Sequence, residues 1–327
     1  MSLAISLPPA GLPLSEVATF AREAEELGYG SAWVAEVAGN DGFALGCAAA
    51  TATSRMRIGT AVVPLNTRGP AMLAMAAATL DGVSGGRGVC GIGVSSEAIV
   101  SGWNDQGSDR PLRRARETIE VLRAIFAGEK VTYEGETVRV RGYRMTPPPL
   151  RPMPIYLGAL NRGMLRLAGE LADGVVLNML GEDFVPTALA EVHAGARLAG
   201  RDPADIEVVL RAHTYVGDDP AAARDGFARG FAAYVVARGY RDFFAWQGYG
   251  ECVAGVDAAF AARDREAARR AISDEMLHSM TVTGDAATVR ARLQAYQDAG
   301  VHTVAVSSFW PDRAHAWETM RVCAPQA

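Results

Sequence analysis

The fold is decided by the stretch RIGTAVVPLNTRGPAMLAMAAATLDGVSGGRGVCGIGVSS, residues 57–96. It begins with the apolar, β-branched run 57–63; Pro70 then suits the first turn of a helix, and the glycines after Asp81 end that helix. A second apolar run, residues 89–94, follows. Runs that are apolar on both faces are typical of strands in a parallel sheet covered by helices. The stretch therefore predicts one β-α-β unit of an α/β protein.

The same alternation continues in both directions along the chain. Eight β/α units in 327 residues predict a (β/α)8 TIM barrel, with a doubly wound open sheet as the alternative. Two less regular stretches are expected insertions, about 98–153 after the fourth strand and 217–280 after the seventh. No linker is visible, so we expect a single domain over residues 1–327. The eight expected strands cover residues 3–7, 31–35, 57–63, 89–94, 155–158, 174–177, 206–214 and 303–307.

The composition excludes several kinds of partner. The chain is 49% hydrophobic and 21% charged, with a formal net charge of -5. No cluster of basic residues alternates with aromatic ones, so no nucleic-acid partner is expected. No apolar run is long enough to span a bilayer, so no membrane partner is expected either. The four cysteines lie far apart and no signal peptide is visible, which favours a reducing, cytoplasmic location.

Several enzyme classes lack the residues that their chemistry needs. Lys130 is the only lysine and lies beyond a charged helical stretch, which argues against Schiff-base enzymes. The absence of an H-x-H pair and the scattered cysteines indicate that no metal is bound. The segment 82–86 matches G-x-S-x-G, but a helix precedes it and a strand follows, so we interpret it as a helix end and turn. So few acids and bases suit a site in which a cofactor carries the chemistry.

Functional groups of a parallel barrel follow the carboxyl ends of its strands. Two catalytic candidates lie there, Glu36 after the second strand and His213 at the end of the seventh. Glu36 could bind the polar edge of a ring or pair with a nearby arginine; His213 could donate a proton or be a hydrogen-bonded wall residue. The loop LGALNRG, residues 157–163, enters a helix whose first N–H groups could bind phosphate, or it is an ordinary turn. Gly91 and Gly93 indicate either close packing or close approach to a ligand.

Several segments together resemble the luciferase-like monooxygenase superfamily, and within it the branch that depends on the deazaflavin coenzyme F420. The resemblance covers most of the chain apart from about 215–280. It implies a TIM barrel with an insertion lid, usually a homodimer, that transfers a hydride between the deazaflavin and a small organic substrate. The alternatives are an FMN-dependent monooxygenase, supplied with reduced flavin by a partner reductase, and a non-enzymatic flavin- or deazaflavin-binding protein. The segments are AREAEELGYGSAWVAE (21–36), 51–87, GIGVSS (91–96) with GW (102–103), 110–135, PIYLGALNRGMLRLAGELADGVVLN (154–178) and VTGDAATVRARLQAYQDAGVHTVAVS (282–307).

The resemblance also implies where the cofactor binds. The ring would lie against a bulge in the third strand that contains a non-prolyl cis peptide bond, at Ala61–Val62. Related sequences have Gly-Pro where this chain has Asn161-Arg162, and Arg162 could add a phosphate contact. Relatives that oxidise a sugar phosphate have Asp-His in place of Glu36-Val37, so that substrate is not expected. The expected cofactor-binding residues are Ala61, Val62, Ser95, Ser96, Gly158, Ala159, Leu160, Asn161, Arg162, Gly163 and Asn178.

Overall fold

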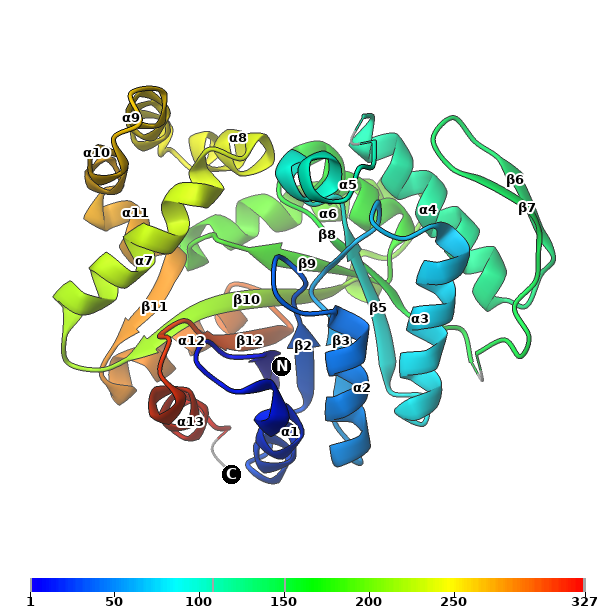
Figure 1. Cartoon of the computed structure of the whole chain (residues 1–327), viewed down its shortest axis with the longest axis horizontal. Coiled ribbons are helices and arrows are strands. Elements are labelled where there is room, and N and C mark those ends of the chain that lie inside the picture. Colours follow the sequence, from blue (N-terminus) through cyan, green and yellow to red (C-terminus); the bar gives the residue numbers. More distant parts are fainter. Residues whose placement is uncertain (1, 108, 150, 326–327) are drawn as a thin grey trace.

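Eight parallel strands form a closed barrel in the computed structural model, which describes residues 2–107, 109–149 and 151–325 (Figure 1). Each strand pairs with the next one along the chain, and the last pairs with the first, so the sheet has no open edge. The TIM-barrel prediction is therefore confirmed over the open sheet. The strands are β1 (Ser2–Leu7), β2 (Ser31–Val34), β3 (Arg57–Thr60), β5 (Gly88–Gly93), β8 (Ile155–Gly158), β9 (Gly174–Asn178), β10 (Glu207–Val216) and β12 (Thr303–Ser308).

Helices cover the outside of the barrel because each presents an apolar face to the strands. Several are started by an aspartate: Asp41, Asp285 and Asp312 each accept a hydrogen bond from a backbone N–H three residues later. The covering helices are α1 (Val17–Glu26), α2 (Gly42–Ala52), α3 (Pro70–Val83), α4 (Pro111–Phe126), α5 (Arg162–Leu171), α6 (Val185–Leu198), α12 (Ala286–Asp298) and α13 (Arg313–Val322). Short elements between them are η1 (Leu14–Glu16), β4 (Val63–Pro64), the π-helical turn η2 (Ala98–Trp103), η3 (Glu182–Phe184) and η4 (Pro203–Asp205).

The two expected insertions lie on different sides of the barrel (Figure 1). Within 98–153, α4 is the fourth helix of the barrel itself, packed between α3 and α5, and the addition is an antiparallel hairpin. The stretch 217–280 is a series of helices that ends at a short strand beside β10. We propose that these parts form one domain with the barrel. The hairpin is β6 (Val131–Glu134) and β7 (Arg139–Tyr143); the second insertion is α7 (Pro220–Val235), α8 (Arg238–Trp246), α9 (Gly250–Ala261), α10 (Arg265–Ala271) and α11 (Asp274–Met280), followed by β11 (Thr281–Gly284).

The barrel interior is filled in layers. Its centre is an apolar cluster to which each of the eight strands contributes one residue. For β3 this residue is Ala61, which directly follows the strand. The layer at the amino-terminal end is polar: Arg57 donates to Glu207 at 2.8 Å and to the Tyr156 hydroxyl at 2.7 Å. This end of the barrel is therefore closed by satisfied polar groups. The central cluster consists of Ala4, Trp33, Ala61, Val89, Tyr156, Val176, Val209 and Ala305.

Both described ends of the chain lie at the amino-terminal end of the barrel. Ser2 begins β1, and Pro325 lies against Gly28 in the turn before β2. Within the described ranges, no helix combines the length and the apolar character needed to cross a membrane.

Candidate active site at the barrel mouth

The strand predicted over 57–63 is interrupted by a bulge. Gly59 pairs with Val89, and Val63 pairs with Ile92, so residues 60–62 stand opposite only two residues of β5. One extra residue on one strand is the definition of a β-bulge, and it bends the strand out of its ladder. The single expected strand is therefore two, β3 and β4.

Thr60 stabilises this bulge with its side chain. Its hydroxyl donates to the Gly91 carbonyl at 2.6 Å and accepts from the Gly91 N–H at 2.9 Å, which replaces the ladder bonds that the bulge interrupts. The following peptide bond, Ala61–Val62, is cis, as the resemblance implied. The Ala61 side chain is buried in the central cluster, whereas Val62 stays partly exposed. A ligand in the mouth would therefore meet Val62 rather than the Ala61 methyl group.

Three glycines make room for the bulge. A Cβ on Gly91 would lie 1.7 Å from the Thr60 carbonyl oxygen. On Gly93 it would lie 2.5 Å from a methyl carbon of Val62, and on Gly158 3.2 Å from both Val62 methyls. Real Cβ atoms do not approach other atoms at the first two distances. Of the two interpretations of Gly91 and Gly93, the structure favours close packing, here against the bulge.

Glu36 is held by an arginine. Arg68 donates to its two carboxylate oxygens at 2.6 and 2.8 Å, and the Gly42 N–H donates at 2.7 Å. Arg68 also pairs with Asp41 at 2.5 Å, and the hydrogen bonds to Glu36 raise the pKa of Arg68. This geometry favours the ion-pair interpretation of Glu36. Glu36 and Arg68 line a cleft of about 270 Å³ together with Val37, Pro64, Thr67, Ile99 and Asn104.

His213, on β10, lies on the wall of the barrel opposite the bulge after β3. Its Nε2 is 3.0 Å from Oδ1 of Asn178, whose amide donates to the Tyr240 hydroxyl at 2.9 Å. Burial, and then the positive charge of Arg211, lower the pKa of His213 to about 3, so the ring is uncharged at neutral pH. Burial raises the pKa of Tyr240 to about 12. This arrangement favours the interpretation of His213 as a hydrogen-bonded wall residue. It also links β9 and β10 to α8, a helix of the second insertion, residues 217–280, which we call the lid.

The start of α5 has no side-chain cap, although Asn161 occupies the capping position and asparagine is a preferred capping residue. Its amide instead donates to the Gly239 carbonyl of α8 at 2.9 Å. The Met164 N–H donates to the Asn161 carbonyl at 2.9 Å, so in the first turn the N–H groups of Arg162 and Gly163 are left for another acceptor. One expected donor is not available: the Ala159 N–H donates to the Val176 carbonyl at 3.1 Å.

The remaining expected residues surround this loop and the end of β5. Leu160 is half-buried against the core. The Arg162 guanidinium lies 4.8 Å from the centre of the Trp246 ring and 3.8 Å from Glu191, so it is turned toward the lid and α6. Ser95 is exposed, with a φ of 61°, and Ser96 accepts from the Ile99 N–H at 3.4 Å. The left-handed Ser95 turns the chain away from the barrel at the mouth.

The lid contributes aromatic side chains to the mouth that the sequence pattern of residues 217–280 did not predict. Phe227 stacks on Phe309 with ring centres 4.3 Å apart, and Phe231 lies edge-to-face on His213 at 5.7 Å. Sequence analysis also missed Arg211. Alternation along β10 was the available signal, because Arg211 lies two residues before His213 and so on the same face.

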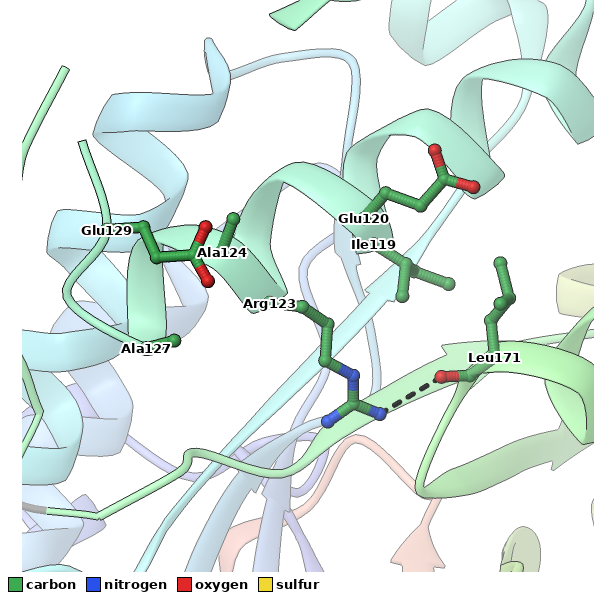
Figure 2. Close-up of a pocket in the computed structure, with 7 residues that line it drawn as sticks. All are labelled: Ile119, Glu120, Arg123, Ala124, Ala127, Glu129 and Leu171. Atoms are coloured by element: carbon green, nitrogen blue, oxygen red, sulfur yellow. Dashed lines mark hydrogen bonds between the residues drawn. The ribbon is translucent and has the colours of Figure 1, made fainter. Parts of the chain in front are cut away.

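A larger hollow, of about 480 Å³, lies away from the mouth (Figure 2). One face of α4 forms most of it, and Arg123 closes one side by donating to the Leu171 carbonyl at 3.0 Å. Leu171 ends α5 and leads to the amino end of β9, so this hollow lies at the opposite end of the barrel from Glu36 and His213. In the described ranges no three His, Cys, Asp or Glu side chains come together as metal ligands.

Comparison with known proteins identifies the family. The family model described as luciferase-like monooxygenase matches residues 3–303. A Mycobacterium tuberculosis protein named as a coenzyme F420-dependent oxidoreductase is 32% identical, over 87% of this chain and 88% of its own. The 5,10-methylenetetrahydromethanopterin reductase of Methanolobus tindarius is 30% identical over 97% of both chains. The structure of the coenzyme F420-dependent tetrahydromethanopterin reductase of Methanopyrus kandleri superposes with a TM-score of 0.83, at 25% identity, over 100% of this chain and 98% of that one. The chain therefore belongs to the luciferase-like monooxygenase family of enzymes.

Proposed function

We propose that this enzyme is a coenzyme F420-dependent oxidoreductase that transfers a hydride between the deazaflavin and a small organic substrate. The observation that carries the proposal is the wall formed by Val62, Gly93 and Gly158, with the uncapped start of α5 three residues further on. An apolar surface beside free N–H groups suits a planar ring that carries a phosphate. The F420-dependent enzymes named above support the choice of F420 over FMN.

The residues present fit that cofactor. Val62 would contact the ring, and Ser95, Ser96 and Asn178 would line its edges. The loop Gly158–Gly163 would hold the phosphate through backbone N–H groups, because the Asn161 amide is bonded to Gly239. When bound, the deazaflavin supplies a ring carbon that accepts or gives a hydride, so the protein needs few acids and bases of its own.

The other mouth residues would position and enclose the substrate. His213 is uncharged and bonded to Asn178, so it would orient that amide rather than supply a proton. The paired Glu36 would hold the chain after β2 in place through Arg68 and Gly42. The aromatic lid helices would exclude water from the reacting groups.

We include a homodimer and a cytoplasmic location in the proposal. The homodimer follows from the resemblance and the location from the scattered cysteines, and α3 offers a surface for a second copy. Its side chains Met72, Met75 and Val83 are 59%, 40% and 43% exposed and recur at helical spacing. Exposed apolar strips of this kind are common at protein interfaces.

Paired fluorescence titrations of the purified protein with F420 and with FMN test the function. We expect F420 to bind at least tenfold tighter, a difference of about 1.4 kcal/mol. Equal or tighter binding of FMN, with oxygen uptake when reduced FMN is supplied, would assign the chain to the FMN-dependent monooxygenases. Tight F420 binding without turnover of any substrate would favour the non-enzymatic binding protein.

A further inference from the structure

The barrel interior holds an arginine near each end, and one of them lacks an acidic partner. Arg57, at the closed end, pairs with Glu207 at 2.8 Å. Arg211, near the mouth, makes no ion pair with any residue of the described ranges. Its two hydrogen bonds are long, 3.4 Å each, and go to the hydroxyls of Ser6 and Ser307. Since a guanidinium carries five N–H donors, most of those of Arg211 have no acceptor in the described chain.

Other arginines below the surface are better satisfied. Arg87, Arg114 and Arg201 also lack a carboxylate partner, but they donate to backbone carbonyls at 2.7, 2.6 and 2.8 Å. Among the described arginines that are not fully exposed, Arg211 is alone in having neither a carboxylate nor a carbonyl acceptor. The Nη1 of Arg211 has no acceptor in the described chain and is accessible rather than buried, so it is open to an anion that enters the mouth.

The place of Arg211 identifies what could bring that anion. Val209, two residues earlier on β10, belongs to the central cluster, so Arg211 faces the same interior one layer nearer the mouth. In the closed barrel three strands separate β10 from β3 in either direction, so Arg211 lies on the wall opposite the bulge. A ring lying against Val62 would turn its free face, and hence the substrate, toward Arg211.

The surroundings of Arg211 favour an anion with an apolar body. His213, on the same strand face, is uncharged and does not compete as a cation for an incoming anion. Ser6 and Ser307 are 3% and 8% exposed, and their hydroxyls can donate to the same group. Phe231 and Phe309 of the lid side stand over His213 with ring centres 5.7 and 6.2 Å away. Apolar neighbours strengthen a charge-assisted hydrogen bond because they exclude water.

We propose that Arg211 binds the carboxylate of the substrate, with Ser6 and Ser307 as further donors, and that the substrate is a small organic acid with an apolar body. The inference rests on the proposed function, because that function puts the substrate between the ring and β10. A guanidinium and a carboxylate match in shape and charge, so the contact fixes orientation as well as affinity. Arg211 thereby becomes a specificity-determining residue of the mouth.

Calorimetric titration with benzoate and with its neutral analogue benzamide tests this proposal, on the protein alone and with F420. We expect the wild-type protein to bind benzoate at least tenfold tighter than benzamide. Arg211→Gln should bring the ratio close to one, and Arg211→Lys should keep a preference for benzoate. The matched control is Arg229→Gln, an exposed arginine on α7 without an ion pair in the described chain, which should leave the ratio unchanged.

Thermal unfolding of the same variants separates binding from a structural role. Since Arg211 has no ion pair to lose, Arg211→Gln should unfold at the wild-type temperature or above it. A wild-type protein without a benzoate preference, or an Arg211→Gln variant that keeps it, overturns the proposal. The proposal is also overturned if Arg211→Gln binds reduced F420 more weakly than the wild-type protein does in the absence of benzoate. The anion that Arg211 binds would then be the cofactor ring. An Arg211-dependent preference in a protein that does not bind F420 supports this inference and contradicts the proposed function.

Discussion

The two walls of the barrel mouth are built from different parts of the chain. On the side of β3, β5 and β8 the wall is backbone: a bulge, three glycines and the start of a helix. On the side of β9, β10 and β12 it is side chains: Asn178, Arg211 and His213, joined through Tyr240 to the lid. The first wall is tightly packed and complete by itself. The second contains a charge without a partner and depends on a separate insertion.

The difference teaches that the two walls tolerate change differently. An added methyl group on Gly91 must displace backbone, and one on Gly93 or Gly158 must displace the Val62 side chain. A wall of polar side chains can lose one member and keep the barrel, but its electrostatics change. Substitutions at the three glycines of the first wall should therefore affect folding, and substitutions on the second wall should affect pH dependence and ligand choice.

The largest effect is expected from Gly91→Ala. The new methyl carbon would lie 1.7 Å from the Thr60 carbonyl oxygen, so β5 or the bulge must shift. We expect a loss of at least about 3 kcal/mol in the free energy of unfolding, measured with urea. The matched control is Gly82→Ala in α3, where nothing lies within 4 Å and the change should be neutral or stabilising by up to about 1 kcal/mol. Equal stability of the two variants would contradict a backbone-built wall.

The second prediction concerns the β10 wall and pH. The pKa of His213 is about 3 in the folded chain and 6.5 in its unperturbed state. Between these values the unfolded chain binds a proton that the folded chain does not, so stability falls as the pH decreases below 6.5. We expect a loss of about 2–3 kcal/mol between roughly pH 6.5 and pH 4.5, and no dependence on this group above that range.

His213→Gln should remove most of that slope, as measured by urea unfolding at a series of pH values. Glutamine keeps an amide that can reach Asn178 and does not titrate. His278→Gln, on an exposed position of α11, serves as the control and should leave the slope in place. An unchanged slope in His213→Gln would mean that His213 is solvated and charged in acid, and that the lid does not cover it.

The smallest effect is expected at the start of α5, in the first wall. Here we compare the loss of a backbone N–H donor with the loss of a side chain, by their effects on F420 binding. Gly163→Pro removes one N–H donor from the second position of the helix, and α6 already carries Pro186 at its own second position. We expect F420 to bind about tenfold more weakly, or ~1.4 kcal/mol, with the fold intact. Asn161→Ala should change binding less, because its amide is bonded to Gly239. The reverse order in fluorescence titrations would show that side chains form the phosphate site.

Most of the fold could be predicted because strong local signals set it. The strand 155–158 begins and ends where the pattern predicted it, and α4 and α6 each begin with a proline in the first turn, a strong local helix signal. The strand 57–63 was predicted as one piece, because an apolar run does not reveal which residues leave the ladder. The helix 111–126 was included in an insertion because its contacts with α3 and α5 are not local.

The site was predictable only in part, and the two walls again differ. The bulge at Ala61–Val62 was predicted from the family resemblance. Glycines and small residues around it mark this backbone arrangement in the sequence. Arg211 and Tyr240 were missed for different reasons. Tyr240 belongs to a lid whose amphipathic pattern identifies helices but not what they cover. The importance of Arg211 lies in the acceptors that it lacks, and a sequence does not show missing partners.

The position of Ser2 and Pro325 beside the same turn, residues 28–30, at the closed end of the barrel has a practical consequence for engineering. A fluorescent reporter, an affinity tag or a surface anchor joined at either end would lie away from the cofactor mouth and the lid. Because Pro325 lies against Gly28 and Ser2 lies against Gly30, a short peptide could also join the two described ends without crossing the barrel. New ends could then be opened elsewhere, so that a permuted enzyme presents its mouth to a fused partner in an orientation that the natural chain order does not allow.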